Sequence, residues 1–131
     1  MTTKRILVVD DDDTVREIVA LCLQRLGGWE ALTVASGQEA LQQAQANPPD
    51  AIVLDVMMPE MDGFTFLQYL RAEEALRSIP VIVLTGQTHL PHPQRFSELG
   101  IVLTVIKPFL PIKFIQAIAQ ALGWPYEGLL R

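Results

Sequence analysis

The stretch ILVVDDDDTVRE, residues 6–17, joins a short apolar run directly to four consecutive aspartates. An unbroken Ile/Leu/Val run is typical of a strand that is buried on both faces of a parallel sheet. Four like charges at the end of such a strand repel one another and gain nothing from packing. This concentration of acid therefore points to a task beyond folding.

Short apolar runs alternate with helical patterns along the rest of the chain. The predicted strands cover residues 5–10, 30–36, 51–56, 80–86 and 101–107. Predicted helices cover residues 14–26, 37–46, 64–74 and 112–122. A further helix, the fourth in chain order, is short or irregular and begins near Pro93, because a residue before proline avoids the helical conformation. This alternation predicts an α/β fold with five helices around an open, doubly wound sheet of five parallel strands.

The spacing of apolar residues predicts which face of each helix lies inward. In the first helix the predicted stripe consists of Val15, Ile18, Val19, Cys22 and Leu26. In the third and last helices the inward positions are Phe66, Leu67 and Leu70, and Ile112, Ile115, Ala119 and Leu122. The letters TVRE at residues 14–17 form a capping-box pattern, which predicts that the first helix begins at Thr14.

Length and composition limit the class of protein. A chain of 131 residues fits one domain, which we expect over residues 1–124 with a short tail over residues 125–131. No apolar stretch approaches the roughly 18–20 residues of a membrane span, and no signal peptide opens the chain, so we expect a cytoplasmic protein without a membrane partner. A net charge of −5 with scattered basic residues argues against direct nucleic-acid binding by this domain. The single cysteine, Cys22, fits a reducing compartment and a buried structural position.

Polar residues follow the predicted strands at their carboxyl ends, where ligands bind in open parallel sheets. The first strand ends in the aspartates 10–13, and the third ends in Asp55. Thr85 ends the fourth strand and Lys107 ends the fifth. Residues that are distant in sequence therefore converge on one edge of an otherwise apolar sheet.

This group of residues has the chemistry of a phosphoryl-accepting site. Carboxylates that gather without counter-ions disfavour ionisation, and a hard divalent cation such as Mg²⁺ relieves the repulsion. Asp10, Asp11 and Asp55 carry −3, Lys107 adds +1 and Mg²⁺ adds +2, so that the formal charges sum to zero. A metal ion, an ammonium group and a hydroxyl around one carboxylate can stabilise an incoming phosphoryl group, with that carboxylate as the nucleophile.

The chain resembles a receiver domain of bacterial two-component response regulators, of the chemotaxis type, from Lys4 to Leu122. The resemblance rests on VVDDD at residues 8–12, LDVMMPEMDG at 54–63, VLTG at 83–86 and KPF at 107–109, in this order. It implies a flavodoxin-like sheet with the strand order 2-1-3-4-5. It also implies a signalling switch that catalyses only its own phosphorylation and slow dephosphorylation.

The resemblance assigns a role to each polar residue. Asp55 is the phospho-acceptor, and Mg²⁺ is held by Asp10, Asp11, Asp55 and the backbone carbonyl of Met57. Asp12 and Asp13 lie where the chain enters the first helix, so we expect them to stabilise its N-terminus rather than to bind the metal.

In the same reading, Lys107 pairs with a phosphoryl oxygen and Thr85 hydrogen-bonds the phosphoryl group. The phosphoryl donor is a histidine kinase or a histidine phosphotransfer protein, the downstream partner is a protein that the sequence does not identify, and a homodimer is one assembly that the family allows. The bond from Lys107 to Pro108 is often cis in the family. Members often carry an aromatic residue where this chain has Thr104, so the aromatic form of the family's switch is not expected here.

Two other classes of function share these features. A phosphorylation-independent adaptor would keep the fold for docking alone, although the intact set of acids, Thr85 and Lys107 argues against it. A Mg²⁺-dependent aspartyl phosphohydrolase has a similar site, but commonly carries a second aspartate where this chain has Met57. Finally, Trp124, Tyr126, Leu129 and Leu130 form an apolar tail that we expect to fold back onto the domain.

Overall fold

The computed structural model describes residues 3–56, 63–86, 94 and 98–125 of the chain. Its sheet has five parallel strands in the order β2-β1-β3-β4-β5. The strands are β1 (Arg5–Val9), β2 (Glu30–Val34), β3 (Ala51–Asp55), β4 (Val81–Thr85) and β5 (Ile101–Ile106). The helices are α1 (Asp13–Arg25), α2 (Gly37–Ala46), α3 (Gly63–Ala72) and α5 (Pro111–Leu122), with a 3₁₀ turn, η1 (Glu74–Leu76), after α3.

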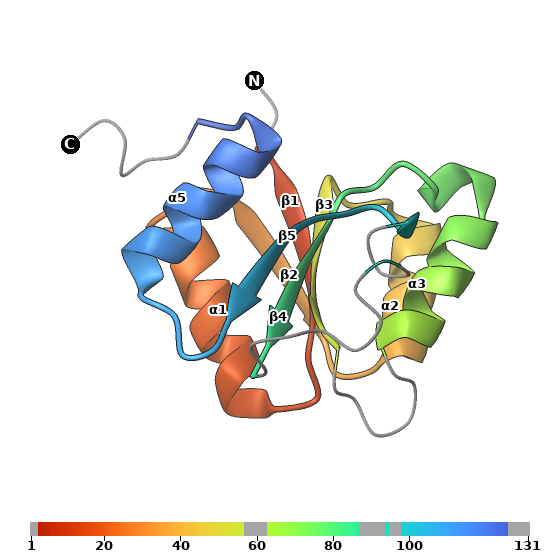
Figure 1. Ribbon diagram of the computed structural model, residues 1–131, viewed down its shortest axis with the longest axis horizontal. Coiled ribbons are helices and arrows are strands. Elements are labelled where there is room, and N and C mark those ends of the chain that lie inside the picture. The colour runs from red at the N-terminus through yellow and green to blue at the C-terminus, as the bar shows by residue number, and fades with distance from the viewer. Residues whose placement is uncertain (1–2, 57–62, 87–93, 95–97, 126–131) are drawn as a thin grey trace.

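The predicted doubly wound sheet and its strand order are confirmed. Figure 1 shows α1 and α5 on one face of the sheet and α2 and α3 on the other. Gln94 and Glu98 are helical. The rest of the predicted fourth helix, including Pro93, lies outside the described residues.

Two apolar layers hold the helices on the sheet. Strands β1, β3 and β4 are buried almost throughout, as their unbroken Ile/Leu/Val runs predict. Because side chains alternate along a strand, Leu7 and Val9 of β1 pack toward α2 and α3, whereas Ile6 and Val8 pack toward α1 and α5. The sheet therefore has a complete core on each face, and its polar groups are confined to its edges.

The first helix begins one residue earlier than predicted, and its buried face is rotated about the helix axis relative to the predicted apolar stripe. Its N-cap is Asp12, whose carboxylate accepts hydrogen bonds from the backbone N–H groups of Thr14 and Val15, so the prediction of Thr14 as the cap is wrong. Ile18 is 48% exposed, whereas Leu23 is fully buried. Ile18 lies about 100° around the helix from Val19, at the rim of the face that Val19 and Leu23 share.

The buried face of the last helix also differs from the predicted one. The buried residues of α5 are Phe114, Ile115, Ile118 and Ala119. Ile112, which was predicted to face inward, is 62% exposed. Burial of the large Phe114 ring removes more apolar area from water than burial of Ile112 would, and this decides the face.

The segment that follows α5, Trp124 and Pro125, contacts Trp29 at the amino end of the sheet. The rings of Trp29 and Trp124 meet edge to face with centroids 5.5 Å apart, and Trp29 Nε1 donates a hydrogen bond to the carbonyl of Pro125 at 3.1 Å. Lys4 Nζ lies 5.4 Å from the centroid of the Trp124 ring, within reach of a cation–π contact. The prediction that Trp124 folds back is confirmed, whereas Tyr126, Leu129 and Leu130 lie outside the described residues.

The structure also bears on two simpler expectations. Cys22 is buried in the layer under α1, as predicted. Within the described ranges, none of the helices combines the length and the apolar character needed to cross a bilayer.

Arg71 connects the end of α3 to two other segments through backbone carbonyls. Its Nε donates to the carbonyl of Leu99 at 2.6 Å, and Nη2 donates to that of Gly100 at 3.3 Å. Nη1 donates to the carbonyls of Leu76 and Arg77 at 3.2 and 3.0 Å. One guanidinium group thus ties α3, η1 and the turn before β5 together.

We predict that Arg71→Ala lowers the free energy of unfolding by about 2–3 kcal/mol, because it leaves several carbonyls without their charged donor. Urea denaturation at neutral pH would measure the change. The control is Arg77→Ala, which removes an exposed guanidinium group and leaves the Arg77 carbonyl in place. Equal stability of the two variants would show that the carbonyl contacts of Arg71 contribute nothing.

Candidate functional site

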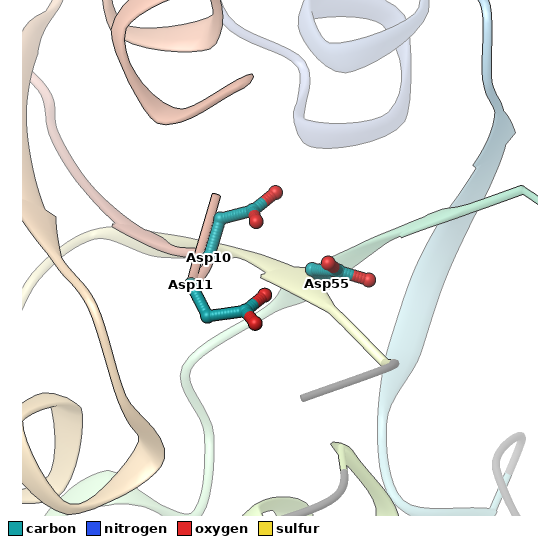
Figure 2. Close-up of side chains that lie close together, drawn as sticks. All are labelled: Asp10, Asp11 and Asp55. Atoms are coloured by element: carbon teal, nitrogen blue, oxygen red, sulfur yellow. The ribbon is translucent and has the colours of Figure 1, made fainter. Parts of the chain in front are cut away.

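The acidic residues come together because β1 and β3 are neighbours in register. Val9 of β1 lies beside Leu54 of β3, so that Asp10 and Asp55 follow at the same level of the sheet. One carboxylate oxygen from each of Asp10, Asp11 and Asp55 lies within 4.8 Å of the others. Figure 2 shows Asp10 and Asp11, at the end of β1, beside Asp55 at the end of β3.

Lys107 brings a positive charge to this group from the far side of β4. Its Nζ lies 3.5 Å from Asp55 Oδ2 and 3.8 Å from Asp10 Oδ2. The backbone N–H of Lys107 donates to the carbonyl of Thr85 at 2.7 Å, and this bond fixes the end of β5 against the end of β4. The peptide bond to Pro108 is cis, as the resemblance suggests.

Asp10 is the most deeply buried member of the group, with 1% of its surface exposed. Its Oδ1 accepts a hydrogen bond from the Asp12 N–H at 2.9 Å. Within the described part of the chain, its Oδ2 is buried and has no hydrogen-bond partner. Burial raises the pKa of Asp10 to about 6, and the negative charge of Asp55 adds to this shift, while the Asp12 N–H and Lys107 oppose it.

The other two aspartates of the run serve the helix, as predicted. Asp12 caps α1 with its carboxylate, and Asp13 lies in the first turn of that helix. Asp11 is exposed and faces the group through one carboxylate oxygen. The division of the four aspartates into a site pair and a helix pair therefore fits their positions.

The loop that follows Asp55 is closed by Gly63. The Gly63 N–H donates to the carbonyl of Val56 at 3.1 Å. A Cβ atom at position 63 would lie 2.7 Å from the Val56 Cα, so this position admits only glycine without a backbone shift. Met57, whose carbonyl was predicted to bind the metal, lies outside the described residues.

Thr85 and Thr104, the two threonines considered in the sequence, differ in their surroundings. Thr85, at the end of β4, is 1% exposed and lies at the same edge of the sheet as the carboxylates. Thr104 lies on β5 beside Val83 and is exposed. The structure therefore places Thr85, but not Thr104, next to the acidic group.

Sequence reasoning missed Arg16, which reaches the site from α1. Its Nη1 donates to the backbone carbonyl of Asp10 at 2.8 Å. The available signal was a basic residue one helical turn inside a helix that starts directly after the acids, where it can reach back to the loop.

These residues fit a divalent cation. The three carboxylates and Lys107 leave a formal charge of −2, and among the described residues the buried Oδ2 of Asp10 has no hydrogen-bond partner. Oxygen ligands from one or two carboxylates, completed by water and phosphate, are those that Mg²⁺ prefers.

Comparison with known proteins identifies the family. A model of the response regulator receiver domain matches residues 6–119. The chain is 43% identical over 108 residues to a probable transcriptional regulator, ycf27, of Cyanophora paradoxa, which covers 82% of this chain and 44% of that protein. The chain thus spans about half the length of the curated relatives that it matches.

Solved structures agree with this match. The chemotaxis response regulator CheY4 of Vibrio cholerae is similar with a TM-score of 0.84 and 33% identity, over 92% of this chain and 99% of that one. The receiver domain of the sensor histidine kinase PA1611 from Pseudomonas aeruginosa has a TM-score of 0.82 and 25% identity, over 93% of this chain and 99% of that one. That receiver domain holds a magnesium ion coordinated in its active-site cleft.

The chain belongs to the response regulator receiver domain family. This is a family of two-component signalling proteins rather than of metabolic enzymes, and it implies acceptance of a phosphoryl group. Receiver domains bind Mg²⁺ in an acidic pocket, and this chain carries a cluster of acidic residues, Asp10, Asp11 and Asp55.

The raised pKa of Asp10 predicts a pH-dependent cost to stability in Mg²⁺-free buffer. Because the folded state holds this proton more tightly than the unfolded state, stability is lost as the pH rises from about 4 to about 6. We expect Asp10→Asn to be more stable than the wild type by on the order of 2–3 kcal/mol at pH 7.5. The advantage should shrink toward zero below pH 4.

Urea denaturation with a chelator at a series of pH values measures this difference. Glu30→Gln is the control for the loss of one negative charge, since Glu30 is exposed at the opposite end of the strands. A stability difference between Asp10→Asn and wild type that stays constant from pH 4 to 7.5 would contradict the prediction.

Proposed function

We propose that this chain is a phospho-accepting switch in which Asp55 takes a phosphoryl group from a phosphohistidine on a histidine kinase or a histidine phosphotransfer protein. The observation that carries the proposal is the meeting of three acidic side chains and one lysine at a single sheet edge, with Asp55 3.5 Å from Lys107. Family membership supports the same chemistry.

In this proposal Asp10, Asp11 and Asp55, with the carbonyl of Met57, hold Mg²⁺. When bound, the ion offsets negative charge on the carboxylates and on the phosphoryl oxygens. The buried Oδ2 of Asp10 supports this assignment, because within the described residues it has no hydrogen-bond partner and only the Lys107 ammonium group at 3.8 Å offsets its charge.

The transfer forms one bond and breaks another. An oxygen of the Asp55 carboxylate bonds to phosphorus while the bond from phosphorus to the imidazole nitrogen breaks. The imidazole leaves as a neutral group, because its other nitrogen already carries a proton. Lys107 lies where its ammonium group can pair with a phosphoryl oxygen, which stabilises the charge that accumulates there.

The product changes the balance of charge and hydrogen bonds at the sheet edge. Phosphorylation raises the negative charge on Asp55 from about −1 to about −2. Thr85 is buried beside the acids and is proposed to hydrogen-bond the phosphoryl group, and the Thr85 carbonyl already holds the Lys107 N–H. The ends of β4 and β5 are therefore the elements that the phosphoryl group biases between two states.

The partners follow from this role. Relatives about twice as long as this chain are named transcriptional regulators, so an output that acts on transcription is one proposal for a protein that contains this domain. The exposed Thr104 replaces the aromatic residue common in the family, so the output cannot depend on burial of a ring at that position.

We predict that wild-type protein gains one phosphoryl group when it is incubated with Mg²⁺ and a small acyl phosphate, and that Asp55→Ala gains none. Intact-mass spectrometry within minutes of mixing measures the adduct. Glu30→Gln, which removes a carboxylate from the opposite edge, should label like wild type. A chelator should abolish labelling of every variant.

Two outcomes would favour the other classes of function. Wild-type protein that stays unlabelled while it remains folded would favour a phosphorylation-independent adaptor. Multiple turnover of a phosphomonoester by the isolated chain would favour a phosphohydrolase. Labelling of Asp55→Ala at the wild-type level would place the acceptor elsewhere.

A further inference from the structure

Arg16 joins the first turn of α1 to the loop that carries the metal-binding acids. Its Nη1 donates to the carbonyl of Asp10 at 2.8 Å, and its Nη2 pairs with the carboxylate of Asp13. The Arg16 side chain is only 18% exposed, whereas that of Asp13 is 83% exposed. The guanidinium group therefore lies largely inside the molecule, and one of its two contacts is with the backbone of the site.

This contact completes the fixation of Asp10. The Asp10 N–H donates to the carbonyl of Val34 in β2 at 3.2 Å. The Asp10 carbonyl accepts from Arg16, and Oδ1 accepts from the Asp12 N–H. Of the four polar atoms of Asp10, three take part in hydrogen bonds with the chain, whereas Oδ2 has no hydrogen-bond partner among the described residues and lies 3.8 Å from Lys107 Nζ.

The held carbonyl belongs to the peptide unit that joins Asp10 to Asp11. Because a peptide unit is planar, fixing its carbonyl also fixes the direction in which the chain continues to the Asp11 Cα. Both carboxylates of the pair thus depend on the same hydrogen bond from Arg16. Loss of this bond frees the peptide to rotate, and the two side chains to separate.

We propose that Arg16 is a positioning residue that pre-organises Asp10 and Asp11 for a divalent cation, a role that rests on the proposed Mg²⁺ site. Groups that orient metal ligands without touching the metal commonly change metal affinity about 10- to 100-fold when they are removed. Arg16 acts through the backbone of one ligand and the chain direction of the next.

The sign of the effect separates positioning from simple charge. Arg16 is a cation beside a cation site, so its charge alone repels Mg²⁺, and its removal would tighten Mg²⁺ binding. Positioning predicts the opposite, because the unbound site becomes disordered and must be ordered again when the ion binds.

Calorimetric titration of the full chain with Mg²⁺ at pH 7.5 tests the proposal. We expect Arg16→Ala to raise the dissociation constant for Mg²⁺ about 10-fold. The dissociation constant of Arg16→Lys should lie between those of Arg16→Ala and wild type. An ammonium group keeps the charge but lacks the planar fork with which the guanidinium group contacts the Asp10 carbonyl and the Asp13 carboxylate together. Arg25→Ala is the control, since it removes an exposed arginine about 14 Å further along the same helix.

A second measurement separates a local effect from loss of the fold. Hydrogen exchange of the Asp12 amide, which donates to Asp10 Oδ1, should be faster in Arg16→Lys than in wild type with a chelator present. Unfolding by urea shows whether each variant is folded. If Arg16→Ala is unfolded, the comparison of Arg16→Lys with wild type tests the proposal.

The outcomes distinguish the two proposals. Absence of Mg²⁺ binding by wild-type protein would overturn the proposed metal site itself. Wild-type binding together with equal or tighter binding by folded Arg16 variants would overturn the positioning role alone. Weaker binding by both Arg16 variants, with Arg25→Ala unchanged, would support it.

Discussion

The structure depends on a single electrostatic constraint, the burial of a carboxylate at the end of a core strand. Asp10 is almost fully covered and lies beside the carboxylates of Asp11 and Asp55. Burial of a charge without full pairing is costly, and Lys107 offsets only part of the charge, from 3.5 to 3.8 Å away. This arrangement lowers the stability of the free protein, and the proposed cation would offset that cost.

The parallel sheet makes this arrangement possible with little local strain. Each polar residue leaves its own strand at the same edge, so the chain needs no special turn to bring Asp10, Asp55 and Lys107 together. The two apolar layers under the helices carry the stability that the edge does not supply. Apolar packing is thus located at the centre of the sheet, and the charged residues of the site are located at one end.

The Val, Ile and Leu runs and the parallel-edge rule were sufficient for a parallel sheet and for the meeting of the acids, whereas the strand order was expected only from the family resemblance. The sequence was insufficient wherever two faces of a helix were nearly equal in apolar character. Ile18 competed with Leu23 on α1, and Ile112 competed with Phe114 on α5; in both cases packing against neighbouring elements decided. Arg16 was missed because its contact is with a backbone carbonyl, and a basic residue one turn inside the helix does not by itself identify that acceptor.

The contact between Trp29 and Trp124 has a consequence for fluorescence. These are the two tryptophans of the chain, and both lie at the amino end of the strands, about 16 Å, one strand length, from the acidic edge. The intrinsic fluorescence of the protein therefore reports on the seam between β2 and the segment at Pro125. It will register melting of that seam, while binding at the distant edge leaves the emission nearly unaltered unless the change travels the length of the sheet.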